Sequence, residues 1–587
     1  METTTIRKLF SDQDRKFKIP AYQRAYSWEK ENILQFVQDL RDASQDYYLG
    51  HFLFEQDEEK LAAKSAANTL LIIDGQQRLT TAIIFFSSLH KELTEKKRAG
   101  EDISIDLEDI VHIYLRDLRK RTQKLETVSD DNNFFVEEII NGKYTHHPLI
   151  TRSQERIRNA RVSFSEVFSK ATLAELEHWY DLVSNAKCTE YRVANKIEAA
   201  RIFAFQNDRG KRLSDLEVLK SYFMLQVYLH GGPPDTMAEH LQYLESEIST
   251  IYRQIVRVKL EEDDVLRYCW QASSDSAGFD TRKTVDEIKI YIMAGTSSEI
   301  CVRIKDFMAA LAKSFRLVEV IENSAAVAIV NLRYLDTMAL AYPFLIRAWI
   351  HGAAEKQVER LARLLENITF RALLRGGRAG IESRLNTCLK LPAEDQYAET
   401  VILAMVNALR NEGWWGYWSD REVQGLLESG FFYKNRVDNY VLWRYEMYLC
   451  SKKGYPPSLK VGYGNLIGNE SIEHIAPLTE SGGDPVVNGY GAYDDTGHPE
   501  NGIVSGEWIN CLGNLMLISQ SHNSSIGNKP FKTKLASYGT DNLLNQQKEI
   551  IRFVTDRSNP VWDKAAIERR QIEIFSVAKV LWSLDNL

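Results

Sequence analysis

The stretch LIIDGQQRLTTAII, residues 71–84, places five polar or flexible residues between two apolar runs. An apolar run that ends in Asp-Gly is typical of a strand followed by a turn, and a helical pattern begins directly after it. The turn alone does not account for Gln76, Gln77 and Arg78 in a row. An arginine beside an amide can bind an anion, because the guanidinium forks onto a phosphate while the amide adds a neutral donor or acceptor. We therefore expect a strand, a turn and a helix whose junction binds a phosphate.

Neighbouring residues extend this hypothesis to a nucleotide site. Asp74 could hold a metal ion or a ribose hydroxyl, and Gly75 would let the backbone approach a ligand. Upstream, the segment IPAYQRAYSW carries a second Gln-Arg pair, Gln23 and Arg24. No Walker A sequence is present, so the nucleoside triphosphate that we expect here would not be bound by a P-loop. The alternative is a structural turn in which the remaining residues are incidental.

The overall composition is that of a multi-domain globular protein. With 587 residues the chain is too long for one ordinary core. The N-terminus has no apolar signal core, and no apolar run approaches the roughly 20 residues of a membrane span, so we expect a cytoplasmic protein with no membrane partner. Six scattered cysteines without a CxxC pair argue against a zinc ribbon. A net charge of −8 weakens the case for a nucleic-acid coating protein, but an enzyme that touches DNA locally need not be basic.

The composition and periodicity of the sequence change twice along the chain. From them we predict an α+β protein that is predominantly helical. Residues 1–229 begin with mixed strand-like and helix-like runs, which suggests an α/β domain with a helical extension. Residues 230–429 have helical periodicity nearly throughout and form the expected helical body. Residues 430–587 contain a Gly-, Pro-, Asp- and Asn-rich region of loops and short strands, closed by a helical piece.

Three pieces of the last part carry groups that phosphodiester hydrolysis needs. They are IEHIAP at 472–477, LGNLMLIS at 512–519 and SHNSSIGNKPFKTK at 521–534. A water must be deprotonated near neutral pH, which suits histidine. The charge on the scissile phosphate needs a hard cation held by oxygen ligands. The histidine ring must also be fixed by a partner such as an amide oxygen.

Five candidate residues follow from this chemistry. His474 is the expected base, and Asn514 is expected to orient it. Glu473 and Asn523 would hold magnesium or another divalent cation, and Lys529 is a further candidate catalytic residue. A single Glu-His pair is weak evidence, because most histidines in strands belong to the core or the surface. The three pieces in this order are much more specific.

These pieces resemble the HNH, or ββα-metal, nucleases, whose pattern is a His-Ile-x-Pro strand, an Asn-Leu strand and a further Asn or His about nine residues later. Asn523 follows Asn514 by nine residues. His474 precedes Asn514 by 40 residues, which is longer than in compact HNH domains and implies an insertion. The cysteines that often flank the last element are absent, so no structural zinc is implied.

The N-terminal blocks YQRAYSW, YYLGHF and IIDGQQRLTT resemble the GmrSD-type, type IV restriction enzymes, whose N-terminal domain has a ParB/sulfiredoxin-like fold. A later block, FAFQNDRGKRLSDLEVLKSYF, resembles the same family and adds Asn207 and Arg209 to the expected nucleotide-binding residues. Within it, Ser214 with Glu217 three residues on predicts a capped helix start. The resemblance implies a nucleotide-binding sensor fused to an HNH nuclease that acts on modified phage DNA. It does not decide whether the chain forms a homo-oligomer.

Other interpretations of the function of the chain remain open at this point. The same two-domain plan resembles the phosphorothioate-sensing protein SspE, in which a backbone modification licenses nicking. The chain could instead be a nucleotide switch that binds DNA and carries an inert HNH remnant. The intact Glu473, His474, Asn514 and Asn523 favour an enzyme. HNH chemistry does not itself distinguish DNA from RNA, so an RNA nuclease is a weaker third alternative.

Overall fold

The computed structural model divides by its internal contacts into two compact units. The first comprises residues 1–270 and 280–322, and the second comprises residues 271–279 and 323–587. The division into parts at 229/230 and 429/430 stays a prediction. The described residues are 2–12, 15–20, 23–43, 47–56, 68–117, 122–143, 148–193, 214–274, 283–376, 380–392, 396–411, 413–428, 432–435, 437–452, 470–478, 488–490, 508–540 and 544–586.

The first unit contains a six-stranded mixed sheet. Its strands lie in the order β1-β8-β3-β4-β2-β7, with β1–β8 and β3–β4 antiparallel and the other pairs parallel. Because β2 and β4 are parallel, the chain leaves both of them at the same edge of the sheet. The two Gln-Arg segments, which follow these strands, are therefore brought together. The strands are β1 Glu2–Thr5, β2 Arg15–Lys18, β3 Tyr48–Gln56, β4 Asn68–Asp74, β7 Leu125–Glu126 and β8 Lys187–Val193.

The stretch 71–84 forms the strand, turn and helix that its pattern predicts. β4 ends at Asp74, Gly75 adopts a left-handed φ of 93°, and α4 begins at the next residue. A Cβ atom at position 75 would lie 2.4 Å from the ring of Phe52. Both the backbone conformation and the available space therefore require glycine at this turn.

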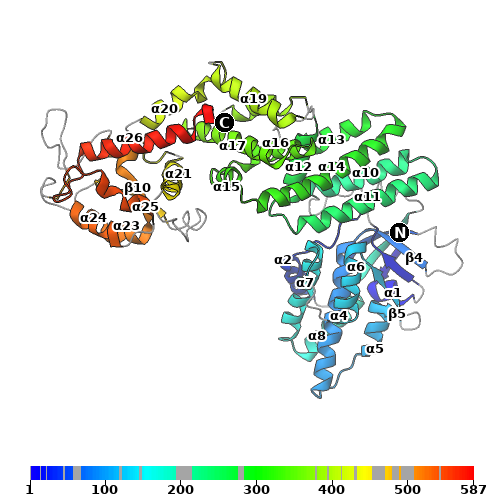
Figure 1. Ribbon diagram of the computed structural model, residues 1–587. Coiled ribbons are helices and arrows are strands. Elements are labelled where there is room, and N and C mark those ends of the chain that lie inside the picture. Colours follow the sequence, from blue (N-terminus) through cyan, green and yellow to red (C-terminus); the bar gives the residue numbers. More distant parts are fainter. Residues whose placement is uncertain are drawn as a thin grey trace. The chain divides into compact units, whose positions relative to one another are not determined.

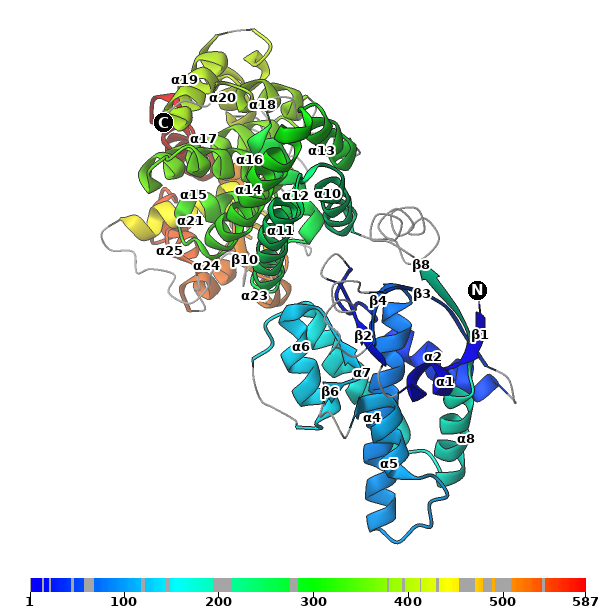
Figure 2. The ribbon, with the colours of Figure 1, turned by 90° about the vertical axis from the view of Figure 1, so that its right-hand side faces the viewer.

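Helix α4 is the central helix of this α/β part. It packs against α7 and α8, as Figures 1 and 2 show, and most of its residues between Gln76 and Leu89 are buried. A stacked pair of rings, Phe86 and Tyr114, lies 3.6 Å apart in the same core. The helices here are α1 Ile6–Ser11, α2 Lys30–Asp42, α4 Gln76–Arg98, α5 Leu107–Ile110, α6 Ser129–Phe135, α7 Arg152–Phe168 and α8 Leu173–Ser184, with π-helical turns at Val111–Leu115 and Val136–Ile140 and a small hairpin of β5 Arg116–Asp117 and β6 Thr122–Gln123.

A group of longer helices follows in the chain. Ser214 caps the first of them as predicted, because its Oγ accepts from the Glu217 amide at 3.2 Å while its own amide donates to the Glu217 carboxylate at 3.3 Å. The helices are α10 Asp215–His230, α11 Pro234–Ile255, α12 Glu262–Ser273, α13 Thr284–Met293 and α14 Ser297–Asn323.

The described part of the second unit is helical apart from one short hairpin. Strands β9 (Glu470–His474) and β10 (Leu515–Ser519) pair antiparallel, and α26 at the end of the chain contacts the turn Leu512–Asn514 before β10. Two apolar clusters lie in this region, one of which includes Leu515 and Leu517 and the other Met516 and Ile518. The helices are α15 Val327–Tyr334, α16 Met338–Ile350, α17 Glu355–Leu374, α18 Ile381–Leu389, α19 Tyr397–Arg410, α20 Asp420–Glu428, α21 Asp438–Ser451, α23 Gln520–Ile526, α24 Phe531–Thr540, α25 Asn545–Lys548 and α26 Lys564–Leu581, with 3-10 turns at Gly416–Trp418, Ile550–Arg552 and Leu584–Asn586.

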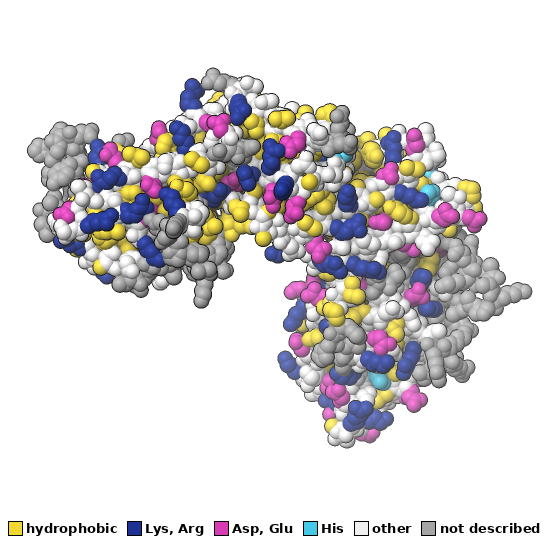
Figure 3. Space-filling model, in the orientation of Figure 1, with side chains coloured by type: hydrophobic (Ala, Val, Ile, Leu, Met, Phe, Trp, Pro, Cys, Tyr) yellow, Lys and Arg dark blue, Asp and Glu magenta, His cyan; other side chains and the backbone are white. Residues whose placement is uncertain are grey.

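The described chain is mostly helical and carries a mixed sheet in its N-terminal part, as the composition and periodicity predict. None of the helices that the structure describes combines the length and apolar character that crossing a membrane requires. On the face drawn in Figure 3, basic and acidic side chains are interspersed and do not separate into one basic surface.

Candidate functional site

The hairpin β9–β10 and the helix α23 bring together the three pieces that carry the C-terminal candidate residues. His474 is the last residue of β9 and lies opposite Leu515, while Glu473 lies opposite Met516. α23 begins directly after β10 and contacts both strands. Figure 1 shows this hairpin beside α23, α24 and α25. The chain thus forms two antiparallel strands followed by a helix.

His474 is a buried histidine held on two sides. Its Nε2 atom lies 3.3 Å from Oδ1 of Asn510, and the ring of Tyr433 meets the imidazole edge to face with 4.5 Å between centroids. Burial lowers the pKa of His474 below its usual value, the Asn510 hydrogen bond raises it, and the charge of Lys534 lowers it further. A neutral imidazole near pH 7 can accept a proton, which is what a general base must do.

Asn514 is fully buried and holds backbone, not the imidazole ring. Its Oδ1 accepts hydrogen bonds from the Ala476 amide at 2.8 Å and the Trp562 indole at 2.9 Å. Its Nδ2 donates to the carbonyls of Ala476 at 3.0 Å and Ile509 at 2.9 Å. We expected Asn514 to orient the ring of His474 directly. None of the four bonds reaches the ring of His474: two hold Ala476 after β9, and the other two hold the Ile509 carbonyl and the Trp562 indole, so an orienting role of Asn514 stays a prediction.

Glu473 lies in a buried ion pair. Lys534 on α24 donates to its Oε1 at 2.6 Å, and Tyr538 donates to the same atom at 2.9 Å. The Lys534 ammonium also donates to the carbonyls of His474 and Ile475. Burial raises the pKa of Glu473 and lowers that of Lys534, and their mutual attraction opposes both shifts. Among the described residues the second oxygen of Glu473 makes no hydrogen bond.

The two remaining C-terminal candidates lie on or just after α23. The Nδ2 atom of Asn523 lies 3.4 Å from the carbonyl of Ile472, so the Asn523 amide sits over β9. Lys529 is exposed, and its ammonium donates to the Ser525 carbonyl at 2.8 Å. Asn523 is therefore placed beside the Glu473–His474 strand, whereas the amine of Lys529 is engaged at the end of α23.

His522, which precedes Asn523 on α23, has hydrogen bonds at both ring nitrogens. Nε2 lies 2.6 Å from the Ser537 hydroxyl, and the Gln547 amide donates to Nδ1 at 3.3 Å. These bonds tie α23 to α24 and α25, which is a structural role.

In the first unit, Gln77 ties α4 to the segment that carries the other Gln-Arg pair. Its Oε1 accepts from the Ser27 amide at 2.8 Å, and its Nε2 donates to the Ala25 carbonyl at 3.0 Å. The buried Gln23 donates in turn to the Ile73 carbonyl at 2.6 Å. Two glutamines thus exchange backbone contacts between the ends of β2 and β4, which explains why amides are needed there.

Arg78 also holds backbone. Its guanidinium donates to the carbonyls of Leu49 at 3.1 Å and His51 at 3.0 Å. The Asp74 carboxylate lies 3.2 Å from the His51 ring and 3.8 Å from Arg78. Gln76 is buried at the first position of α4. Asp74 and Arg78 therefore have structural partners, whereas the buried Oε1 of Gln76 makes no hydrogen bond to the described residues. The role of these residues in nucleotide binding stays a prediction.

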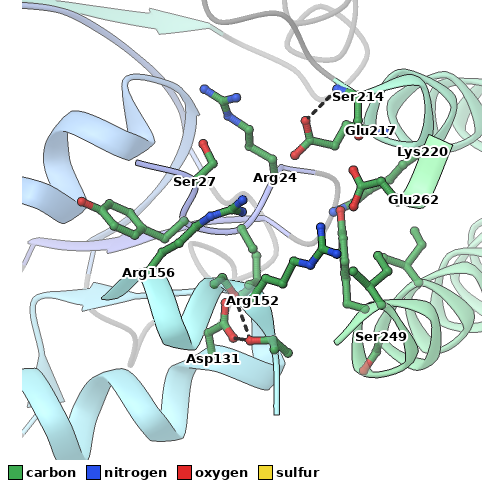
Figure 4. Close-up of a pocket in the computed structure, with 18 of the residues that line it drawn as sticks. Arg24, Ser27, Asp131, Arg152, Arg156, Ser214, Glu217, Lys220, Ser249 and Glu262 are labelled. Carbon is green, nitrogen blue, oxygen red and sulfur yellow. Dashed lines mark hydrogen bonds between the residues drawn. The ribbon is translucent and has the colours of Figure 1, made fainter. Parts of the chain in front are cut away.

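A cavity of about 350 Å³ lies in the same unit, between the segment that carries Arg24 and the helices α7, α10, α11 and α12. Of the predicted nucleotide-binding residues that the structure describes, Arg24 lines this cavity and those of DGQQR do not. Asn207 and Arg209 lie outside the described residues. Figure 4 shows Arg24, Arg152 and Arg156 around the cavity with Glu217 and Glu262 at its right, and the guanidinium of Arg24 points away from these two glutamates.

Several charged groups at the cavity already have partners. Arg152 pairs with Glu261 at 3.0 Å, and Arg156 pairs with Glu29 at 2.6 Å. The buried Lys220 donates to the Gln23 carbonyl at 2.7 Å, and burial lowers its pKa to about 8. α10 is therefore tied to the end of the same Gln-Arg segment that Gln77 holds from α4.

Two polar groups at the cavity stand out. The hydroxyl of Tyr252 is buried and makes no hydrogen bond within the described part of the chain. The guanidinium of Arg24 makes no hydrogen bond or ion pair to any residue that the structure describes. Burial raises the pKa of Tyr252, and the positive charge of Arg24 opposes this shift. A cavity of this size is large enough for a small ligand.

The fold places residues at these sites that the sequence patterns did not single out. Asn510 and Tyr433 contact His474 from outside the three pieces. Lys534 is the last residue of the third piece and lies on α24, but the sequence pattern gave it no role. Arg570 on α26 is fully buried and donates to the carbonyls of Leu512, Gly513 and Leu515, at 3.1, 2.9 and 2.6 Å.

Two family models match the chain, each over the part that contains one of these sites. The model described as the GmrSD restriction endonuclease N-terminal domain matches residues 6–224. The model described as the GmrSD restriction endonucleases C-terminal domain matches residues 420–577. The chain belongs to the GmrSD restriction endonuclease family. A comparison with curated proteins finds no match.

Family membership confirms the resemblance on which the two-site interpretation depends. The chain is a restriction endonuclease of the type IV kind, and DNA is the partner that this class implies. The C-terminal match contains β9, β10 and α23, together with Tyr433 and Asn510. The N-terminal match contains the sheet, α4 and Arg24. Neither model covers residues 225–419.

Proposed function

We propose that this GmrSD-family protein is an HNH-type nuclease that cuts modified DNA, and that the cut is made at His474. The observation that carries this proposal is the environment of His474, a buried imidazole at the end of β9, next to the Glu473 carboxylate in a strand that α23 contacts through Asn523. His474 would take the proton from the attacking water. Asn514 would hold the turn after β9, so that the imidazole keeps its place relative to the strand.

The oxygen atoms of Glu473 and Asn523 fit a divalent cation, on the condition that Lys534 leaves one oxygen of Glu473 to the metal. Glu473 offers a carboxylate oxygen with no hydrogen bond among the described residues, and Asn523 offers an amide oxygen from α23. Both are the hard oxygen ligands that Mg²⁺ prefers. The described residues contain no cluster of three or more His, Cys, Asp and Glu side chains, so water and substrate phosphate would have to complete the shell. When bound, the cation would stabilise the charge that develops on the scissile phosphate.

The condition concerns Lys534. Its ammonium neutralises Glu473, and a cation next to the same carboxylate would be repelled by it. Glu473 would therefore bind the metal through its second oxygen, with Lys534 staying on Oε1. Lys534 has two opposite effects on metal binding. It keeps the Glu473 carboxylate ionised and fixed, which favours binding of the metal, but its positive charge weakens the attraction between the carboxylate and the metal.

The first unit would sense a ligand that regulates cleavage, and we place a nucleoside triphosphate in the cavity beside Arg24. Arg24 and the Tyr252 hydroxyl are a cation and a donor without partners in the described chain. Both would suit a phosphate and its ester oxygens. The segment that carries Arg24 is tied to α4 by Gln77 and to α10 by Lys220, so a ligand on Arg24 would act on both helices.

The experiment that tests this function compares substrates. The purified full chain is incubated with Mg²⁺, with and without ATP or GTP, on unmodified, glucosylated and phosphorothioated DNA and on RNA. Cleavage of a base-modified DNA above the unmodified control supports the proposal. Nicking of phosphorothioated DNA alone would support the SspE-like alternative, and cleavage of RNA alone the RNA nuclease. Nucleotide-dependent DNA binding without cleavage of any substrate would identify a switch with an inert nuclease site.

A further inference from the structure

Asn510 is fixed in the structure through its own backbone and that of its neighbour. The Asn510 carbonyl accepts hydrogen bonds from the amides of Phe432 at 2.9 Å and Tyr433 at 3.0 Å. The preceding carbonyl, that of Ile509, accepts from the amide of Asn514 at 2.9 Å. The Asn510 side chain therefore leaves a backbone that is held on both sides, and its direction is set by elements outside the hairpin.

The side chain of Asn510 meets the ring of His474. Its Oδ1 lies 3.3 Å from Nε2 of His474, and Tyr433, whose amide binds the Asn510 carbonyl, places its own ring against the imidazole. Tyr433, in the segment before α21, and Asn510, which precedes β10 in the chain, therefore both confine the imidazole. The Nδ1 atom of His474 has no hydrogen-bond partner among the described residues.

An amide oxygen only accepts hydrogen bonds, so Nε2 carries the proton when it faces Oδ1, and Nδ1 is left with its lone pair. A general base needs one ring nitrogen unprotonated and aimed at the water, and the group on the other nitrogen decides which tautomer is present. We propose that Asn510 is the positioning residue that holds His474 in the Nε2–H tautomer and so makes Nδ1 the atom that accepts the proton.

This inference rests on the proposed nuclease role of His474. Asn510 itself touches neither water nor phosphate in the proposal and acts only through the ring. Among the described residues, the ring of Tyr433 contacts the imidazole and the ammonium of Lys534 donates to the carbonyl of His474, while the carboxylate of the adjacent Glu473 is held by Lys534 and Tyr538. A change at Asn510 leaves these groups in place.

Two substitutions separate positioning from packing. Asn510→Asp puts a carboxylate where the amide oxygen was, which favours the imidazolium, so the acidic limb of the kcat profile should move up by about one pH unit or more. Asn510→Leu keeps the size but removes the acceptor, so kcat should fall about 10–100-fold with little change in KM. Asn559→Asp adds the same charge at an exposed position and should leave the profile unchanged.

The readout is DNA cleavage by the full chain across pH, with His474→Ala in the same assay. If His474→Ala cleaves normally, the nuclease role of His474 fails and Asn510 is not at issue. If His474→Ala is inactive while both Asn510 variants keep the wild-type kcat and pH profile, the positioning role of Asn510 is wrong. A shifted limb in Asn510→Asp, with Asn559→Asp unchanged, supports it.

A spectroscopic measurement keeps the inference testable if an Asn510 variant does not fold. Long-range nitrogen–proton NMR spectra of the wild-type chain, with ¹⁵N-labelled histidine, report the tautomer of each ring. The His474 signals are assigned as those lost in His474→Ala. The inference expects a protonated Nε2 and a bare Nδ1 at neutral pH. The opposite tautomer would overturn it without any variant of Asn510.

Discussion

Nζ of Lys534 lies 2.6 Å from Oε1 of Glu473, and both side chains are almost completely buried. Such a pair is stable only while both members are present, because either one alone would be an unpaired charge in the protein interior. Lys534 also reaches the carbonyls of His474 and Ile475, so the pair joins α24 to the end of β9. The stability of the second unit and the geometry of its candidate residues are therefore linked.

Lys534→Met should destabilise the second unit, because it leaves the Glu473 carboxylate buried without its counter-charge. Breaking one side of a buried pair costs about 3–5 kcal/mol, which thermal or urea unfolding of the full chain would detect. The double variant Lys534→Met with Glu473→Gln removes both charges and should recover part of this loss. A single variant as stable as wild type would mean that the two charges do not depend on each other.

Gln77→Ala should loosen the segment that carries Arg24. The change leaves the Ser27 amide and the Ala25 carbonyl without partners, at roughly 1–3 kcal/mol for each group that stays buried. Hydrogen exchange of residues 23–28 should then speed up. Gln38→Ala is the matched control, because Gln38 bonds only to Asp42 on the exposed face of α2. Equal exchange in the two variants would contradict the role of Gln77 as a clamp.

Substitution of Arg24 should affect nucleotide binding, whereas substitution of Arg78 should affect thermal stability. Arg24→Ala should weaken ATP or GTP binding about 10–100-fold, the size of one charge-assisted phosphate contact, while the melting temperature stays the same. Arg78→Ala should lower the melting temperature, because it frees the carbonyls of Leu49 and His51. Calorimetry and thermal melts measure the two effects. Loss of binding in a stable Arg78→Ala protein, with Arg24→Ala normal, would move the nucleotide site to DGQQR.

The pH dependence of cleavage follows from His474. Burial lowers the pKa of His474 in the folded chain below its usual value of 6.5, so more than half of the imidazole is neutral at pH 6.5 and the acidic limb of the kcat profile should lie below that pH. The same shift makes the unfolded chain bind more protons, so this residue's contribution to stability decreases as the pH falls through 6.5. A limb above pH 6.5 would show that another group, or a protonated His474, controls the rate.

The sequence predicts those structural features of the protein that are determined by residues close together in the chain. The stretch 71–84 folds into the predicted strand, turn and helix because apolar periodicity and an Asp-Gly pair act locally. The helix cap at Ser214 is local in the same way. The residues that phosphate chemistry requires also sit in recognisable short pieces, and two family models match over them.

The partners of those residues could not be read from the sequence. Asn510 reaches His474 across 36 positions, and Lys534 reaches Glu473 across 61. Such contacts depend on how α21, α24 and α26 pack around the hairpin. The glutamines of DGQQR show the same limit, since an amide that clamps backbone and an amide that reads a phosphate look alike in a sequence. Only their partners, Ser27 and Ala25, distinguish the two roles.

The most direct test of the central claim, that His474 is the base of a DNA nuclease, uses the full chain. Wild type and His474→Ala are compared for Mg²⁺-dependent cleavage of modified DNA, with His498→Ala as a histidine control that removes no proposed site residue. The account predicts that His474→Ala loses cleavage, keeps the wild-type melting temperature and still binds nucleotide, while His498→Ala cuts normally. Cleavage by a folded His474→Ala protein at the wild-type rate would contradict it.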